Sequence, residues 1–248
     1  MITIFDAQLA PALKAGTASL AGVLLTYPID TALRQKQAGK KVNFLNTLKY
    51  RGFIPSAANL ALSRSLAFNY VEKFKADSRY SSTQAILLGS GIVGAIKPFI
   101  LYPIDLIKIQ FQTQTASTYS QAKTNILALP VRHHIRAINF MQARGIVGFS
   151  TWFLTQEQFN SLIDIQSPHL KHMITGGLSS VCISVMIQPF EVGKIINQTG
   201  NFQPLFTLLK THGISRFYTS SIFCYSISKN VVNGAVFNTI YSAFNYSS

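Results

Sequence analysis

The stretch Tyr27-Pro28-Ile29-Asp30 recurs as Tyr102-Pro103-Ile104-Asp105, and a looser copy reads Gln188-Pro189-Phe190-Glu191. Other residues keep a fixed distance from each proline. A glycine lies twelve residues before it and a glutamine nine residues after it: Gly16, Gly91 and Gly177, and Gln37, Gln112 and Gln198. Five residues after the proline the second and third copies have Lys108 and Lys194, whereas the first has Leu33. Three copies in phase predict a threefold internal repeat.

The spacing within each copy predicts a kinked helix with one charged face. Proline removes a helical hydrogen bond and clashes with the preceding turn. The acid and the lysine are three residues apart, so they share a face, and the small glycine lets helices approach closely. The acid could pair with the lysine of its own helix or with that of the next repeat. The second arrangement would close a ring of ion pairs across a pore.

Charge-poor stretches of about 20 residues, the length that a membrane helix needs, predict six membrane spans. They cover 8–29, 52–71, 82–104, 137–156, 169–190 and 220–241. Only 12% of the 248 residues are charged, against ~25% in soluble domains. This composition argues against an ordinary soluble enzyme. The alternative is a soluble helical bundle with buried core helices. The chain is predicted to be a single domain, 1–248, whose three repeats cover about 8–80, 81–166 and 167–248.

Charges are sorted between alternate connecting segments, and the net charge is +14. Segments 31–51, 106–136 and 192–219 hold thirteen Lys and Arg residues and no acid. The alternation requires six spans with both termini on the side away from these basic loops. The positive-inside rule puts the basic loops on the cytoplasm-like face, which is the matrix for a mitochondrial inner membrane.

With these motifs the chain resembles the mitochondrial carrier family, whose hallmark is a threefold P-x-(D/E)-x-x-(K/R) repeat. The resemblance implies an all-α membrane protein with six transmembrane helices in three pseudo-symmetric two-helix repeats around a central cavity. It implies a transporter of the inner membrane rather than an enzyme. Tyr50-Arg51-Gly52 matches the family's aromatic-(K/R)-G motif. The basic loop with Lys40 and Lys41 would bind cardiolipin, although a solvated charge run is an equal alternative.

The resemblance also implies a matrix gate of ion pairs. Asp30 would meet Lys108, and Asp105 would meet Lys194. Glu191 would face Leu33, so the third pair is expected to be broken. Gln37, Gln112 and Gln198 match the family's glutamine braces, which hydrogen-bond across such pairs.

The opposite gate, with the family pattern (F/Y)-(D/E)-x-x-(K/R), is expected to be weaker. The matching positions hold Glu72 and Lys75, Glu157 and Asn160, and Ser242 and Asn245. Around the ring, Glu72 would face Asn160, Glu157 would face Asn245, and Ser242 would face Lys75, so no acid meets a base. We therefore expect a resting state closed on the matrix side and open on the other. The alternative is that hydrophobic packing dominates both gates.

Family substrate contacts lie thirteen residues before the acid position of the second helix in each repeat. This rule points to Asn59, to Arg144 with Gly145, and to Lys229, or Ser228 if the register slips. Lys97 is a third candidate cation, and Arg64 and Lys14 are others that could line the cavity or reach the membrane surface. Cations without an acid between the gates favour an anion, which arginine can hold bidentately.

The identity of the anion stays open among nucleotide, carboxylate and phosphate. Gly145-Ile146 resembles the second contact of adenine-nucleotide carriers and slightly favours a nucleotide, but the RRRMMM signature of close ADP/ATP exchangers is absent. We expect alternating access, exchange, function as a monomer, and no cofactor, metal or nucleic acid. The alternative is a degenerate carrier fold that serves as a membrane receptor or scaffold, favoured by Leu33 and the depleted second gate.

Overall fold

The computed structural model describes residues 2–42, 50, 52–198, 207, 210, 213, 218 and 220–246. Within these residues the chain is helical and contains no strand. The helices are α1 (Ile2–Gln37), α3 (Phe53–Lys75), α4 (Ser82–Gln112), α5 (Tyr119–Leu127), α6 (Val131–Leu162), α7 (Pro168–Gln198) and α9 (Ser220–Tyr246). Each of the six predicted spans lies in one long helix. A helix of 31 residues is about 46 Å long at 1.5 Å per residue, so α4 and α7 exceed the ~30 Å of a hydrocarbon core.

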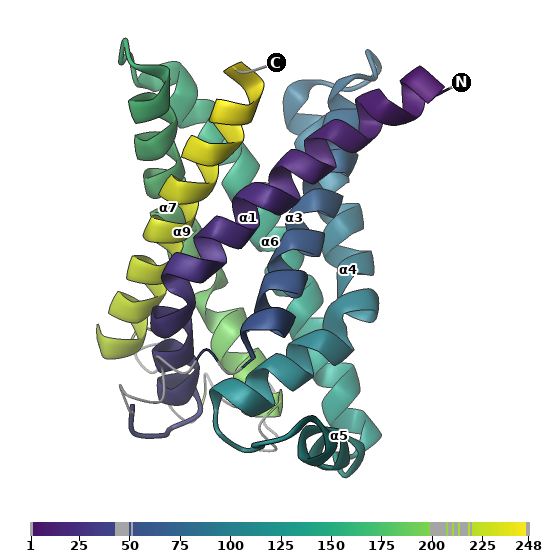
Figure 1. Cartoon of the computed structure of the whole chain (residues 1–248), viewed down its shortest axis with the longest axis vertical. Coiled ribbons are helices and arrows are strands. Elements are labelled where there is room, and N and C mark those ends of the chain that lie inside the picture. The colour runs from purple at the N-terminus through teal and green to yellow at the C-terminus, as the bar shows by residue number, and fades with distance from the viewer. Residues whose placement is uncertain are drawn as a thin grey trace.

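The six long helices form a closed ring in chain order. The first, α1, packs against α3, which packs against α4, and α4 packs against α6. The ring continues through α7 to α9, which returns to α1. Both termini lie at one end of the bundle and α5 lies at the other (Figure 1). An even number of crossings therefore leaves the two termini together.

The surface and the interior of this ring have opposite polarity. Large apolar side chains such as Leu25, Phe99 and Met186 are exposed on the outside, whereas Ser63 and Asn233 are buried. Only α4 and Pro168–Ile196 of α7, among the described helices, are long and apolar enough to count as spans by hydropathy alone. Because polar residues gather inside the ring, mean hydropathy under-reports the other four helices.

The helices continue through the repeated prolines and carry the repeated acids into the interior. Asp30, Asp105 and Glu191 are each at most 5% exposed. They lie near the C-terminal ends of α1, α4 and α7, which is the α5 end of the bundle (Figure 1). The predicted stripes thus face one another at this end.

The repeated glycines do not mark the closest helix contacts. Of the three, only Gly16 lies in a tight contact, and the expectation for the other two is wrong. The tight approaches are at Gly94 against Ile146 and at Gly176 against Gly234. Gly94 and Gly176 lie within three residues of the repeated glycines Gly91 and Gly177. They make the close contacts because they lie on the helix face that packs against the neighbouring helix.

Gly52 explains one motif of the first repeat. It precedes α3 with a φ of 80°, and a Cβ there would lie 3.1 Å from Phe111 Cβ. Only glycine fits this turn without strain. Arg51 of the same motif lies outside the described residues. In the second repeat α6 begins at Val131, so Ala137 is already inside the helix and no such turn exists.

Candidate functional site

Buried ion pairs link the first helices of the repeats at the α5 end. Lys108 Nζ lies 2.8 Å from Asp30 Oδ2, and Lys194 Nζ lies 3.2 Å from Asp105 Oδ2. These are the two pairs that the repeat predicted between neighbouring copies. They join α1 to α4 and α4 to α7.

The third acid has partners as well, so the expectation that Glu191 lacks one is wrong. Arg34 Nη1 lies 2.5 Å from Glu191 Oε2, and Arg34 Nη2 lies 3.5 Å from Asp30 Oδ1. Arg144 also forms an ion pair with Glu191. Arg34 follows Leu33 directly, and its longer side chain reaches the acid while Leu33 packs in the core at 1% exposure. The ring from α1 through α4 and α7 back to α1 is therefore closed.

All three repeated glutamines hydrogen-bond to this network. Gln112 Nε2 donates to Asp30 Oδ2 at 3.0 Å, and Gln198 Nε2 donates to Asp105 Oδ2 at 2.9 Å. Gln37 Oε1 accepts from Arg34 Nη1 at 2.9 Å. Because hydrogen bonds to charged groups contribute about 1.5–3 kcal/mol each, the glutamines stabilise the charges as well as their geometry.

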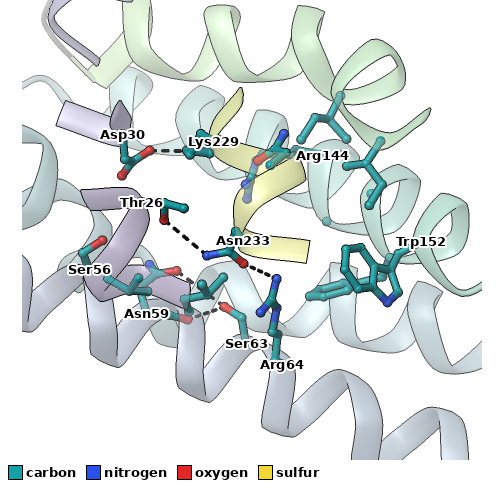
Figure 2. Close-up of a pocket in the computed structure, with 18 of the residues that line it drawn as sticks. Thr26, Asp30, Ser56, Asn59, Ser63, Arg64, Arg144, Trp152, Lys229 and Asn233 are labelled. Atoms are coloured by element: carbon teal, nitrogen blue, oxygen red, sulfur yellow. Dashed lines mark hydrogen bonds and ion pairs between the residues drawn. The ribbon is translucent and has the colours of Figure 1, made fainter. Parts of the chain in front are cut away.

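A cavity lies beside the ion-pair network, and all six long helices line it. Its volume is about 160 Å³, roughly ten times what a single water needs, so a small solute can enter. The residues that the sequence assigned to the substrate all line it: Asn59, Lys97, Arg144, Gly145 and Lys229. Figure 2 shows Lys229 and Arg144 near Asp30, with Asn59 and Arg64 further along the cavity.

Three of these residues contact the three acids in cyclic order. Asn59 Nδ2 lies 3.5 Å from Asp105 Oδ1, and Lys229 Nζ lies 3.3 Å from Asp30 Oδ1. Arg144 pairs with Glu191. Each contact joins the second helix of one repeat to the first helix of the next. Among the described lining residues the acids are those of the gate, as expected, and the long side chains of Arg144 and Lys229 reach gate acids.

The other two assigned residues lie differently. Lys97 is 5% exposed, and its Nζ lies 5.1 Å from the centre of the Phe149 ring. No carboxylate within the described ranges lies at ion-pair distance from it. A Cβ on Gly145 would lie 3.0 Å from Gly94 Cα. Gly145 thus permits close packing of α6 on α4 in addition to lining the cavity.

The opposite end contains an ion pair that the sequence did not predict. Lys75 Nζ lies 3.8 Å from Glu157 Oε1, and the Ser82 hydroxyl donates to the same oxygen. The expectation that no acid meets a base here is wrong, because the pair joins α3 to α6 rather than following the assumed order. Both side chains are more than 30% exposed, so the pair contributes at most about 1 kcal/mol.

Aromatic packing joins the second helices at this end. The Phe68 ring lies 5.1 Å from that of Phe153 and 5.4 Å from that of Phe237, and all three are at most 8% exposed. They come from α3, α6 and α9. The sequence carried a signal for two of them, since Phe68 and Phe153 each lie four residues before a glutamate of the second gate. Rings from three helices thus meet at the end that was expected to be open. The alternative that hydrophobic packing dominates both gates does not describe the α5 end, where buried ion pairs join the helices.

The basic loop contacts the neighbouring repeat. Lys40 Nζ donates to the Thr113 carbonyl at 2.6 Å, and the Tyr50 ring stacks on Tyr27 at 5.2 Å. Lys41 is exposed. One of the two lysines assigned to a lipid is therefore engaged by the protein.

Comparison with known proteins identifies relatives of this chain. Residues 79–163 match the family model described as "Mitochondrial carrier protein", and this stretch contains α4, α5 and α6. The mitochondrial arginine transporter BAC2 of Arabidopsis thaliana is 24% identical over 75% of this chain and 72% of its own length. The mitochondrial glycine transporter YMC1 of Saccharomyces cerevisiae is 26% identical over 86% of this chain and 84% of its own length.

Proposed function

We propose that the chain is a mitochondrial carrier that moves a small anionic metabolite across the mitochondrial inner membrane by alternating access, in exchange for a second solute. The observation that carries this proposal is the excess of positive charge around the cavity. Seven cations line it: Arg34, Arg64, Lys97, Lys108, Arg144, Lys194 and Lys229. Against them stand two lining acids, Asp30 and Asp105, and Glu191, which pairs with Arg34 and Arg144. Seven positive charges against three negative charges leave four positive charges for an anion to neutralise.

The cyclic contacts supply a mechanism for coupling binding to opening. Arg144 and Lys229 hold Glu191 and Asp30 in this structure. An entering anion competes for the same guanidinium and ammonium groups, because both prefer a negative oxygen. When they turn toward the solute, two acids of the gate lose a partner each. The binding energy of the solute is thereby used to weaken the closed state.

An amino acid is the second candidate, because the two relatives are named for arginine and glycine transport. Its carboxylate would meet the same cations. Its ammonium group would need a free acid, yet Asp30, Asp105 and Glu191 each already pair with a base. This charge balance favours an anion over a zwitterion.

A non-transporting scaffold receives less support. Its argument rested on the broken pair at Leu33 and on the depleted second gate, but Arg34 provides Glu191 with a base and Lys75 pairs with Glu157. We place both termini on the cytosolic side and the basic loops in the matrix, following the positive-inside rule. We further propose that the protein functions as a monomer and binds anionic lipid.

Uptake into liposomes tests the function. The purified protein is reconstituted into liposomes preloaded with ATP, malate, phosphate or nothing, and uptake of labelled ATP, malate, phosphate, arginine and glycine is measured. The proposal predicts uptake of at least one anion that depends on a preloaded anion. Uptake restricted to amino acids would replace the anion by a zwitterion, and no uptake by folded protein would favour the scaffold.

A further inference from the structure

Two cations of the cavity lining, Lys97 and Arg64, lie apart from the ion-pair network, and we infer that Arg64 binds the solute. Arg64, oriented by Asn233, forms a second anion-binding position at the aromatic end of the cavity, where it receives a carboxylate or phosphate group of the carried solute. The inference rests on the proposed function and deepens it. It adds a residue outside the three positions that the repeat assigns to the substrate.

The position of Arg64 separates it from the gate acids. It lies five residues beyond Asn59 on α3, about 7 Å further along the helix axis. Its Nη2 donates to Asn233 Oδ1 on α9, and α3 and α9 are not neighbours in the ring. Asn233 Nδ2 in turn donates to Thr26 Oγ1 on α1 at 3.4 Å. Figure 2 shows this chain of polar groups crossing the cavity.

No acidic side chain among the described residues neutralises the charge of Arg64. No carboxylate in the described part of the chain lies within ion-pair distance of it. Its Nη1 is buried without a hydrogen-bond partner. Its Cζ lies 3.9 Å from the centre of the Phe237 ring and 5.4 Å from that of Trp152. Aromatic faces compensate a desolvated cation only in part.

A purely structural role accounts poorly for this arrangement. One hydrogen bond to Asn233 could come from a neutral amide, which would avoid the cost of desolvating a charge. A carboxylate or phosphate oxygen would instead satisfy the free N–H groups of the guanidinium, which can bind bidentately. Arg144 and Lys229 already have acids, so Arg64 is the arginine of the cavity lining whose charge an anion meets without competition.

The test measures binding and transport with Arg64→Gln. Malate, phosphate and ATP are titrated separately against the purified protein, and the concentration that half-maximally raises its Tm is recorded with KM for uptake. For each anion that stabilises the wild type, Arg64→Gln should raise that concentration and KM at least tenfold. Arg64→Lys should recover part of the affinity. Asn233→Ala should raise KM about threefold, because the charge remains but loses its orientation. Comparison of the three anions distinguishes carboxylate from phosphate.

Arg79→Gln is the matched control. Arg79 lies beyond the end of α3, where its side chain hydrogen-bonds to Asp77 and lowers the pKa of that carboxyl to about 2. The control removes one arginine charge outside the cavity, so it should leave the half-maximal concentrations within twofold of wild type.

The outcomes separate the two proposals. If Arg64→Gln lowers the basal Tm but leaves half-maximal concentrations and KM unchanged, Arg64 is only structural and the inference fails while transport stands. If Arg64→Gln does not fold, Asn233→Ala and Arg64→Lys decide: unchanged KM in both overturns the inference, and a raised KM in both supports it. If the wild type neither binds nor carries any of the three anions, the proposed function fails and the inference with it.

Discussion

The two ends of the bundle are closed by different physics. At the α5 end, Asp30, Asp105 and Glu191 form ion pairs with basic residues of other helices, and glutamine side chains hydrogen-bond to these charged groups. At the end with the termini, Phe68 packs against two other aromatic rings, and the exposed Lys75–Glu157 ion pair joins α3 to α6. The difference teaches that an anion can weaken the α5 end by competing for the cations that hold its acids, whereas an anion bound to Arg64 at the aromatic end breaks no ion pair. Substitutions at the two ends should therefore differ in size and in anion sensitivity.

The largest effect is expected from Glu191→Gln. The amide leaves Arg144 without an acid and leaves Arg34 with only its 3.5 Å contact to Asp30, and breaking a buried ion pair costs about 3–5 kcal/mol. The Tm of the purified protein should fall strongly, and uptake should be lost. Gln158→Ala, a change at an exposed position of α6, is the control and should leave the Tm unchanged. An unaltered Tm for Glu191→Gln would mean that the ion-pair end is not what stabilises this state.

Phe68→Ala tests the aromatic end. The ring packs against Phe153 and Phe237, and a truncation of this kind costs about 3 kcal/mol. The loss should already appear without an anion, because the substitution removes ring packing and breaks no ion pair. Thermal unfolding with and without the transported anion measures it. Full stability of Phe68→Ala would remove the aromatic closure from the comparison.

Leu33→Lys separates the structural account from the one based on sequence. The repeat alone predicts that the lysine restores a lost pair and stabilises the closed gate. In the structure Arg34 already serves Glu191, so the lysine would be an extra buried cation. Burying a charge that has no acid of its own is costly, so Leu33→Lys should lower the Tm of the purified protein.

The double variant Leu33→Lys with Arg34→Leu is the control for that prediction, since it moves the cation instead of adding one. It should recover stability relative to Leu33→Lys alone. A higher Tm for the single Leu33→Lys variant would contradict the role given to Arg34.

The smallest effect is expected from Lys75→Gln. The pair with Glu157 is 3.8 Å long and both side chains are exposed, so its loss should cost less than about 1 kcal/mol. The Tm should stay within a few degrees of wild type. A loss as large as that of Phe68→Ala would show that ion pairs matter equally at both ends.

Much of the architecture could be predicted from the sequence because the repeat is explicit. The proline-acid copies located the ends of α1, α4 and α7, and the family resemblance implied two ion pairs, Asp30–Lys108 and Asp105–Lys194, that are present. Charge-poor stretches located all six long helices. These features are local in the chain or repeat in phase, so a pattern can reveal them.

The remaining features depend on side-chain reach and on contacts distant in the chain. Arg34 lies one residue from the repeated lysine position, although its spacing of four from Asp30 was a signal of a shared helix face. The contact of Lys229 with Asp30 joins residues 199 positions apart. The Lys75–Glu157 pair connects helices that are not ring neighbours. None of these follows from periodicity.

The central claim is that the cations that hold the gate acids also receive the anion. Thr31 is 4% exposed between Asp30 and Arg34 on α1, and Thr31→Cys in a Cys182→Ser, Cys224→Ser background reports on this gate. The rate of its labelling by a membrane-impermeant maleimide from the basic-loop side is measured with and without the transported anion. We predict slow labelling without the anion, at least fivefold faster labelling with it, and no acceleration in Arg144→Gln with Lys229→Gln. Fast labelling without any anion, or acceleration that persists in that double variant, would contradict the account.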